Sequence, residues 1–348
     1  MRVVVTGASG NTGTSLLQAL ADEPAVDSIV GLARRAPTTS FTKTEWVRAD
    51  VSTSDLLPIF TGADAVVHLA WLIQPSRNLT AVGLTNVNGS ERVFRAVGEA
   101  GVPNLVYASS IGAYSAAPQD RSVDESWPTD GIRTSFYSRH KSQVERLLDS
   151  FEKEFPQVRV VRLRPGLIFK RQAASSIRRL FLGPFVPTRL VRPDLIPIFP
   201  ELRGVRFQCV HSLDVGHAYR LAIVGDVRGP FNIAADPVLD FAEVAKLLDA
   251  RPVPFPKALV RIGADVTWRL RLQPSPPGWV DLAVGSPVMD TTRARTELQW
   301  KPRYTSKEAL GELITGLHNR EGIDTPPLSP QAGGPLRIRE VLTGVGSR

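Results

Sequence analysis

The stretch that decides the fold lies near the start of the chain and reads Arg2-Val3-Val4-Val5-Thr6-Gly7-Ala8-Ser9-Gly10-Asn11-Thr12-Gly13. Its β-branched residues predict a strand over 2–5, and a helical pattern follows over 12–21. The glycines between them permit positive φ and a close approach of the backbone to a pyrophosphate. The first turn of the helix then offers free N–H groups to phosphate oxygens. This order predicts a dinucleotide-binding turn formed by Gly7, Ser9, Gly10, Asn11, Thr12 and Gly13.

The rest of the first half alternates short apolar runs with helical patterns. Strands are predicted at residues 28–32, 45–48, 64–70, 104–109 and 158–163, and helices at 54–60, 88–100 and 136–155. Alternation of this kind implies right-handed crossovers. We therefore predict an α/β fold with a Rossmann-type, doubly wound parallel sheet. Further strands at 205–210 and 231–234 and helices at 215–224, 241–248 and 308–318 follow.

The end of the second strand indicates which dinucleotide binds. An NAD site has an acid there for the ribose 2′-hydroxyl, whereas an NADP site has arginine. The segment ends with Arg34 and Arg35 and contains no acid, so it favours NADP(H), with NAD(H) remaining possible. Asp50, after the third strand, can accept a hydrogen bond from the adenine amine or serve only its own loop.

Two further features fit carbonyl and alcohol chemistry. Tyr137 and Lys141 are four residues apart, so on a helix they share a face. A phenol has a pKa of about 10, and a nearby ammonium lowers it, which makes tyrosine a usable proton donor or acceptor. Ser110 follows the fifth strand, where ligands bind in open α/β sheets, and its hydroxyl can hydrogen-bond a reacting oxygen.

With these residues in place, the chain resembles the extended short-chain dehydrogenase/reductases, also called the NAD-dependent epimerase/dehydratase family. The resemblance covers roughly residues 1–317. It is carried by the motifs Thr6-Gly7-x-x-Gly10-x-x-Gly13, Val67-His68-Leu69-Ala70, Asn86-Val87-Asn88-Gly89-Ser90, Ala108-Ser109-Ser110, Tyr137-x-x-x-Lys141, Leu163-Arg164-Pro165-Gly166, Val210-His211-x-x-Asp214 and Phe231-Asn232-Ile233-Ala234. Near the C-terminal end, Asp290-Thr291-Thr292-Arg293-Ala294 and Leu298-Gln299-Trp300-Lys301-Pro302 add to it.

The resemblance implies a role for each matching residue. Tyr137 is the acid/base, Lys141 tunes it and holds the nicotinamide ribose, and Ser110 orients the substrate oxygen. The dinucleotide site gains Val51, Leu69, Ala70, Asn86 and Pro165, with Ala70 lining the cleft and Asn86 beside the nicotinamide. The expected substrate is a small molecule, and no metal ligand set is expected, because the five histidines and one cysteine lack metal-ligand spacing.

Departures from the family pattern disfavour some of the reactions that the family catalyses. Family dehydratases carry an Asp-Glu pair after the active-site hydroxyl residue, but Ile111 and Gly112 follow Ser110. Many nucleotide-sugar epimerases carry an arginine four residues before the histidine of the Val-His-x-x-Asp motif. Phe207 has that position, and Arg206 is one residue away, so on a strand it points to the other face.

Three functions follow from these residues. The first is an NAD(P)(H)-dependent oxidoreductase that interconverts a secondary alcohol and a carbonyl. The second is a nucleotide-sugar epimerase that works by transient oxidation. The third is a dinucleotide-binding sensor without turnover, which the presence of both Tyr137 and Lys141 disfavours.

The domain boundaries follow from the change of pattern after residue 169. Residues 1–169 are expected to form the dinucleotide-binding domain and 170–325 mainly a smaller C-terminal substrate-binding α/β domain, with 205–235 partly returning to the first. Residues 326–348, rich in Pro and Gly, are expected to be a flexible tail. The apolar, basic segment 177–200 is expected to be a lid or substrate wall.

The composition indicates the class of protein and the compartment in which it is expected. The chain has 348 residues, 43% of them hydrophobic and 22% charged, as is usual for a soluble globular protein. Its single cysteine, Cys209, excludes an internal disulfide and fits a reducing, cytoplasmic compartment. The net charge of +8 is concentrated in segment 170–206, which is interpreted as a solvated loop or an anion-attracting patch. No nucleic-acid motif or membrane span is predicted, and a homodimer through the helices at 88–100 and 136–155 is possible by analogy with the family.

Overall fold

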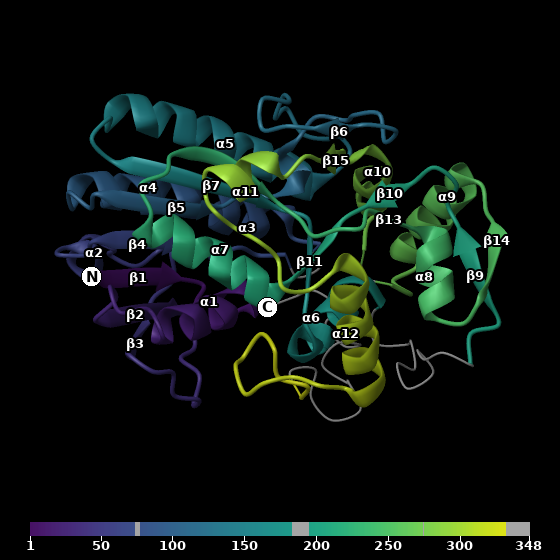
Figure 1. Ribbon diagram of the computed structural model, residues 1–348, viewed down its shortest axis with the longest axis horizontal. Helices are drawn as coiled ribbons and strands as arrows, with labels where there is room; N and C mark the ends of the chain where they lie inside the picture. The colour runs from purple at the N-terminus through teal and green to yellow at the C-terminus, as the bar shows by residue number, and fades with distance from the viewer. Residues whose placement is uncertain (74–76, 183–194, 274, 332–348) are drawn as a thin grey trace.

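A seven-stranded parallel sheet dominates the computed structural model, which describes residues 1–73, 77–182, 195–273 and 275–331. Its strands lie in the order β12 (Gly229–Ile233), β7 (Arg159–Pro165), β5 (Asn104–Ala108), β4 (Ala65–His68), β1 (Arg2–Thr6), β2 (Ser28–Ala33) and β3 (Thr44–Arg48). Chain order moves outward from β1 in both directions, which is the doubly wound arrangement. The predicted Rossmann-type α/β fold is therefore confirmed (Figure 1).

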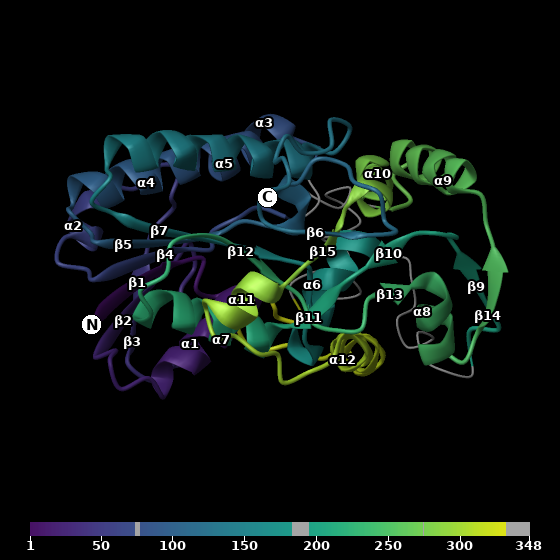
Figure 2. The ribbon, with the colours of Figure 1, turned by 45° about the horizontal axis from the view of Figure 1, so that its top comes forward.

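Helices cover both faces of this sheet (Figure 2). Helices α1 (Asn11–Ala21) and α7 (Ser212–Val224) pack on one face, and α4 (Gly89–Glu99) and α5 (Phe136–Glu154) on the other. Each face has its own apolar core, centred on Val3 and Val5 in one case and on Val4 and Val66 in the other. The central strands β1, β4 and β5 are largely apolar because both of their faces are buried.

Smaller elements, most of them from the second half of the chain, lie beside the sheet. The strands are β6 (Ser122–Val123), β8 (Leu167–Phe169), β9 (Ile198–Glu201), β10 (Arg206–Phe207), β11 (Cys209–His211), β13 (Leu239–Asp240), β14 (Arg251–Pro254) and β15 (Val288–Met289). They form the two-stranded pairs β10–β13, β11–β8, β14–β9 and β15–β6. The α-helices are α6 (Ala174–Ile177), α8 (Phe241–Leu247), α9 (Lys257–Arg269), α10 (Gly278–Gly285), α11 (Thr292–Thr296) and α12 (Ser306–Asn319).

The elements differ from the sequence prediction in several places. The helix expected over 54–60 is only α2 (Leu57–Phe60), because the Ser54 hydroxyl accepts the Asp50 N–H and holds the preceding residues in a turn. The strand expected over 205–210 divides into β10 and β11, which pair with different partners. Helix α9 lies inside a proline cluster for which no helix was predicted.

A turn of π-helix over Leu84–Asn88 joins α3 (Leu79–Gly83) to α4, so the helix expected over 88–100 extends backwards. Within the described part of the chain, no helix has both the length and the apolar character needed to cross a membrane. Most of the expected tail, residues 332–348, and the centre of the expected lid, residues 183–194, lie outside the described residues.

Candidate functional site

The predicted site residues gather along one edge of the large sheet, because the carboxyl ends of parallel strands all point the same way. Gly7 to Gly13 follow β1, Arg34 and Arg35 follow β2, and Asp50 and Val51 follow β3. Leu69 and Ala70 follow β4, Ser110 follows β5, and Pro165 ends β7. Helix α5 brings Tyr137 and Lys141 to the same edge, and the π-helical turn brings Asn86.

The glycine turn after β1 has the geometry of a phosphate cradle. Gly7 has a φ of +70°, and a Cβ there would lie 2.7 Å from the Ala70 nitrogen. A Cβ on Gly13 would lie 2.4 Å from the Ala8 carbonyl oxygen. Helix α1 has Gly10 as its N-cap, which provides no side-chain cap, and its first turn contains no acid. The residues present therefore fit a dinucleotide pyrophosphate, which the first N–H groups of α1 can bind.

The adenosine end of the edge lies near β2 and β3. Arg34 and Arg35 are both exposed directly after β2. The Asp50 carboxylate accepts hydrogen bonds from the Ser52 N–H, at 3.0 Å, and from the Ser52 hydroxyl, at 2.5 Å. Asp50 thus has a structural task in its own loop, which was one of the two roles left open for it.

Tyr137 meets Ser110 where α5 begins. Ser135 caps the helix by accepting the Ser138 N–H, and this fixes the first turn, in which Tyr137 lies. Ser110 lies near enough to Tyr137 for its hydroxyl to act on the pKa of the phenol. Gly112 makes room for the ring, since a Cβ there would lie 2.7 Å from the Tyr137 Cε1. Two of the three predicted catalytic side chains therefore lie together beside Gly112.

Lys141, the third of them, is 3% exposed and points toward the end of β5. Its ammonium donates to the Ala108 carbonyl oxygen at 2.6 Å and to the Tyr107 hydroxyl at 3.4 Å. It also lies 3.5 Å from the ring centroid of Trp71. Burial lowers the pKa of Lys141 well below its ordinary value, against the opposing effect of Glu145.

Two tryptophans enclose the Tyr137 ring, and sequence reasoning singled out neither. Trp71 lies edge-on at 6.1 Å between centroids, and Trp279 lies at 5.1 Å with the rings tilted by 32°. The Phe181 ring meets Trp279 edge to face, with 5.4 Å between the ring centroids. Gly278 lets α10 approach closely, because a Cβ there would lie 2.4 Å from the Thr134 carbonyl oxygen. Only the position of Trp71, directly after the Val67 to Ala70 motif, gave a local signal.

This aromatic enclosure determines the titration of Tyr137. Burial raises the pKa of Tyr137 to about 12, while the Ser110 hydroxyl acts to lower it. The Tyr–Lys spacing had predicted the reverse shift. The difference arises because the Lys141 ammonium is directed at Ala108, and because aromatic rings flank the phenol where water would otherwise stabilise its charged form.

Asn86 holds the backbone that follows β4. Its side-chain oxygen accepts the Leu72 N–H at 2.7 Å, and its amide nitrogen donates to the Leu72 carbonyl at 3.0 Å. Asn86 therefore fixes the segment that carries Trp71. Such a contact between a helix and a distant loop has no signature in local sequence spacing.

The basic segment 170–206 is not simply a solvated loop in its described part. Lys170 is 5% exposed, and its ammonium contacts the first turn of α1 through the Asn11 carbonyl, the Thr14 hydroxyl and the Ser15 hydroxyl, at 2.9, 2.7 and 2.9 Å. Burial lowers the pKa of Lys170 to about 7. The interpretation of this residue as part of a solvated surface is therefore wrong.

The position expected for a diphosphate-binding arginine holds an apolar side chain. Phe207 packs against Phe241 at 6.1 Å between ring centroids. Arg206 donates from its guanidinium to the Gln119 carbonyl at 3.2 Å, and its N–H bonds to the Gln119 side chain. The neighbouring arginine thus fastens β10 to the segment before β6.

The parallel sheet and the residues at its carboxyl edge define a Rossmann-type α/β protein with a dinucleotide-binding turn and a group of serine, tyrosine and lysine. Residues 3–181 match the NAD dependent epimerase/dehydratase family, and the chain belongs to that family. The family is defined as NAD dependent, so a nicotinamide dinucleotide is the cofactor that the match supports.

Three individual similarities add detail. An uncharacterized protein of Mycobacterium tuberculosis is 26% identical over 326 residues, which cover 93% of this chain but only 31% of that protein, so the chain spans about a third of its length. The 3 beta-hydroxysteroid dehydrogenase/Delta 5→4-isomerase of the same species is 23% identical, covering 90% of this chain and 89% of that enzyme. The structure of MoeE5 with UDP-glucuronic acid and NAD superposes with a TM-score of 0.68 at 23% identity, covering 92% and 99%.

Proposed function

We propose that this protein is an NAD(P)(H)-dependent oxidoreductase that interconverts a secondary alcohol and a carbonyl, with Tyr137 as the acid/base. The observation that carries the proposal is that the Tyr137 and Ser110 side chains both lie against Gly112 after β5, since a Cβ on Gly112 would lie 2.7 Å from the Tyr137 Cε1 and 3.4 Å from the Ser110 Oγ. That pair lies on the same sheet edge as the glycine turn between β1 and α1. A carbonyl oxygen that met both hydroxyls would face a nicotinamide dinucleotide extending along this edge.

Tyr137 is in the protonated form that carbonyl reduction requires of a proton donor. With a pKa of about 12, the phenol is protonated at neutral pH and is ready to donate. A bound nicotinamide dinucleotide supplies hydride to the carbonyl carbon. The Tyr137 hydroxyl gives its proton to the carbonyl oxygen while the Ser110 hydroxyl holds that oxygen. Lys141, on the same face of α5, is available to hold the ribose of the dinucleotide.

NADP(H) is the dinucleotide that the β2 end favours. Arg34 and Arg35 follow β2 directly, are exposed, and can bind a 2′-phosphate with charge-assisted hydrogen bonds. No acid follows β2 to accept a ribose 2′-hydroxyl. NAD(H) is the alternative, since MoeE5 was solved with NAD.

An apolar substrate fits the side chains around Tyr137. Trp71 and Trp279 flank the reacting hydroxyl, and Phe181 extends the aromatic surface. The 3 beta-hydroxysteroid dehydrogenase similarity supports oxidation of a secondary alcohol on an apolar compound. We infer that the substrate is an apolar carbonyl compound or the corresponding alcohol.

A nucleotide-sugar epimerase is the second candidate, because MoeE5 was solved with UDP-glucuronic acid. Such a substrate carries a diphosphate, which needs cationic partners. Phe207 packs against Phe241 where the diphosphate-binding arginine was expected, and the Arg206 guanidinium bonds to Gln119. These contacts weigh against the epimerase.

The test combines identification of the bound cofactor with a variant that lacks only the Tyr137 hydroxyl. The purified protein is denatured, any released dinucleotide is identified by mass, and NADPH consumption is followed with a panel of alicyclic and aromatic ketones. We expect exchangeable cofactor and NADPH-dependent reduction. Tyr137→Phe should lower kcat at least roughly 100-fold with unchanged NADPH affinity, because it removes only the donated proton.

Tyr304→Phe is the matched control, since the Tyr304 ring stacks on His211 at 3.9 Å, outside the aromatic group around Tyr137. It should retain wild-type turnover. Normal turnover by Tyr137→Phe would remove the proposed acid/base. Tightly held, stoichiometric NAD together with interconversion of UDP-glucose and UDP-galactose would establish the epimerase, and dinucleotide binding without any turnover would favour the sensor.

A further inference from the structure

Lys170 is a buried cation whose partners within the protein are all neutral. It follows β8 directly and is 5% exposed. Its ammonium has three acceptors, the Asn11 carbonyl, the Thr14 hydroxyl and the Ser15 hydroxyl. Among the residues that the structure describes, no carboxylate forms an ion pair with it. Burying an unpaired charge is costly, so a function for this charge is expected.

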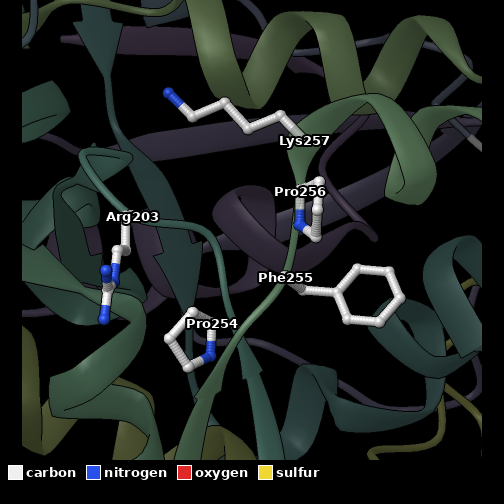
Figure 3. A pocket seen from close by; sticks show the side chains of 5 residues that line it. All are labelled: Arg203, Pro254, Phe255, Pro256 and Lys257. Atoms are coloured by element: carbon white, nitrogen blue, oxygen red, sulfur yellow. The ribbon is translucent and has the colours of Figure 1, made fainter.

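Other cations of the same basic segment are held differently. Arg171, the next residue, bonds to the Glu312 carboxylate of α12 at 3.1 Å. Arg203 is 75% exposed and pairs with Glu201 at 3.7 Å. It also lines a pocket of about 340 Å³ (Figure 3), with Pro254, Phe255, Pro256 and Lys257. Lys170 differs from both arginines because it is buried and has no carboxylate partner.

The ammonium of Lys170 lies against the peptide group that faces the dinucleotide pyrophosphate. The first hydrogen bond of α1 runs from the Thr14 N–H to the Gly10 carbonyl, so the N–H groups before it are left for phosphate oxygens. The Thr12 N–H is one of these. It belongs to the same peptide group as the Asn11 carbonyl, which accepts the ammonium at 2.9 Å. A hydrogen bond to this carbonyl polarises the peptide group and makes its N–H a stronger donor.

The distance from the ammonium to a bound phosphate is short enough for a direct electrostatic effect. Peptide dimensions put the Lys170 ammonium within roughly 5 Å of the Thr12 nitrogen, and a phosphate oxygen bound there lies about 3 Å further away. With an effective dielectric constant of about 20, a unit charge at roughly 8 Å changes the affinity for an anion roughly 10–30-fold.

The N-terminus of α7 adds to the same positive region. Helices α1 and α7 lie side by side (Figures 1 and 2), and the Ser212 hydroxyl at the start of α7 donates to the Asn11 carbonyl at 3.2 Å. Gly216 permits the close crossing, because a Cβ there would lie 2.5 Å from the Ser15 carbonyl oxygen. Two helix N-termini and an ammonium together favour a bound anion at this place.

The charged and titratable groups on the neighbouring elements have other partners. The His211 side chain, the N-cap of α7, accepts the Leu213 N–H, and burial lowers the pKa of this imidazole. The Asp214 carboxylate accepts the Tyr304 N–H at 3.0 Å. On α12, Glu312 is already paired with an arginine. None of these groups therefore replaces an anion bound at the first turn of α1.

We propose that Lys170 is a positioning residue for the dinucleotide, whose ammonium form is the buried counter-charge of the pyrophosphate. This inference rests on the dinucleotide binding of the proposed function. In the protein without ligand, burial lowers the pKa of Lys170 to about 7, so at pH 8 most molecules carry the neutral amine. A bound pyrophosphate stabilises the ammonium. Binding at pH 8 therefore transfers a proton from the buffer to the Lys170 amine.

The test is calorimetric titration of the ligand-free, full-length protein with NADPH at pH 8, in buffers of different ionisation enthalpy. The wild-type protein should take up roughly half a proton per NADPH, and its Kd should rise roughly tenfold between pH 7 and pH 9.5. A phosphate monoester titrates near pH 6, below this range. NADH, which lacks the 2′-phosphate, should show the same proton uptake.

Two variants separate the charge of Lys170 from its hydrogen bonds. Lys170→Met and Lys170→Gln should each bind NADPH roughly tenfold more weakly at pH 7, without proton uptake and with no dependence on pH up to 9.5. Glutamine can still hydrogen-bond to the first turn of α1, so its failure would not be one of lost contacts. Circular dichroism checks that both variants are folded.

Lys43→Met is the matched control, since Lys43 donates to the Glu23 carbonyl beyond the other end of α1. Its NADPH affinity and proton uptake should equal those of the wild-type protein. NADPH binding by the wild-type protein without proton uptake would overturn the inference and leave the proposed function standing. Full uptake by both Lys170 variants, with only their thermal stability lowered, would show a structural role and also overturn it. A protein that binds neither dinucleotide would refute the proposed function and this inference together.

Discussion

Replacing Glu145 by glutamine is expected to destabilise the protein by about 3–5 kcal/mol, because Glu145 neutralises two buried arginines. Its carboxylate is 1% exposed. Arg162 donates to it at 2.9 Å, and Arg164 makes two further bonds at 2.9 and 3.0 Å. Ser109 donates to the same carboxylate. Glutamine keeps the shape of the side chain but removes the charge that these guanidinium groups require.

The pKa of Glu145 gives an independent magnitude. Burial would raise it, but Arg164, Arg162 and the Ser109 hydroxyl hold it at about 2, against an ordinary value of 4.5. That difference corresponds to about 3 kcal/mol of stabilisation by the ionised form. Because the pKa of the folded state is depressed, the stabilisation is fully present above pH 4.5 and is lost as the pH falls toward 2. The free energy expected for removing a buried ion-pair partner and the free energy from the pKa difference of Glu145 are therefore similar in size.

Urea unfolding followed by tryptophan fluorescence measures the effect, first at pH 7 and then between pH 5 and pH 2. The wild-type protein should lose stability steeply over the acid range, and Glu145→Gln should lack that part of the slope. Glu152→Gln is the matched control, because Glu152 pairs with Arg162 from a position 36% exposed and should cost less than about 1 kcal/mol. If Glu145→Gln at pH 7 costs no more than this control, the proposed neutralisation is refuted.

Three other perturbations test the glycine turn, the cofactor and the tyrosine. Gly13→Ala should destabilise the protein by about 1–3 kcal/mol, because the new Cβ would meet a backbone carbonyl. Gly263→Ala, where a Cβ would meet nothing within 4 Å, should stabilise it by about 0.5–1 kcal/mol. Thermal unfolding of the two variants measures the difference. Arg34→Ala with Arg35→Ala should weaken NADPH binding roughly 10–100-fold and NADH binding little, and equal losses in fluorescence titrations would exclude a 2′-phosphate contact. Trp279→Ala should admit water and bring the pKa of Tyr137 from about 12 toward 10, so the basic limb of the pH–rate profile should move to lower pH, while Trp279→Phe should leave it nearly in place.

The sheet could be predicted from the sequence because it depends on local patterns. Runs such as Val3 to Val5 are apolar without a period, as strands covered on both faces must be. Gly10 and Gly13 mark the start of α1 for a steric reason that holds in any such turn. Helix α9 was missed because the prolines around it suggested a loop. In the structure Pro256 is its N-cap, so proline delimits that helix instead of breaking it.

The site could be predicted only where its residues are close in sequence or follow strand ends. The spacing of Tyr137 and Lys141 placed them on one face of α5, and Ser110 followed from the end of β5. Trp279 of α10 contacts Tyr137 of α5, and no local sequence pattern predicts a contact between residues so distant in the chain. The direction of the tyrosine pKa shift depends on this enclosure, so it required the three-dimensional arrangement.

Helix α5 explains why a buried charge network accompanies this site. Tyr137, Lys141 and Glu145 follow one another at four-residue spacing, so one face of α5 carries all three. Glu145 binds Ser109 of the β5 end and Arg164 of β7, which fixes the rotation and height of the helix relative to the sheet. A buried ion network adds little net stability compared with apolar packing, but removing one member is costly. Such a network holds a helix in one position, and here that position brings the Tyr137 hydroxyl to Ser110, the geometry on which proton transfer to a carbonyl depends.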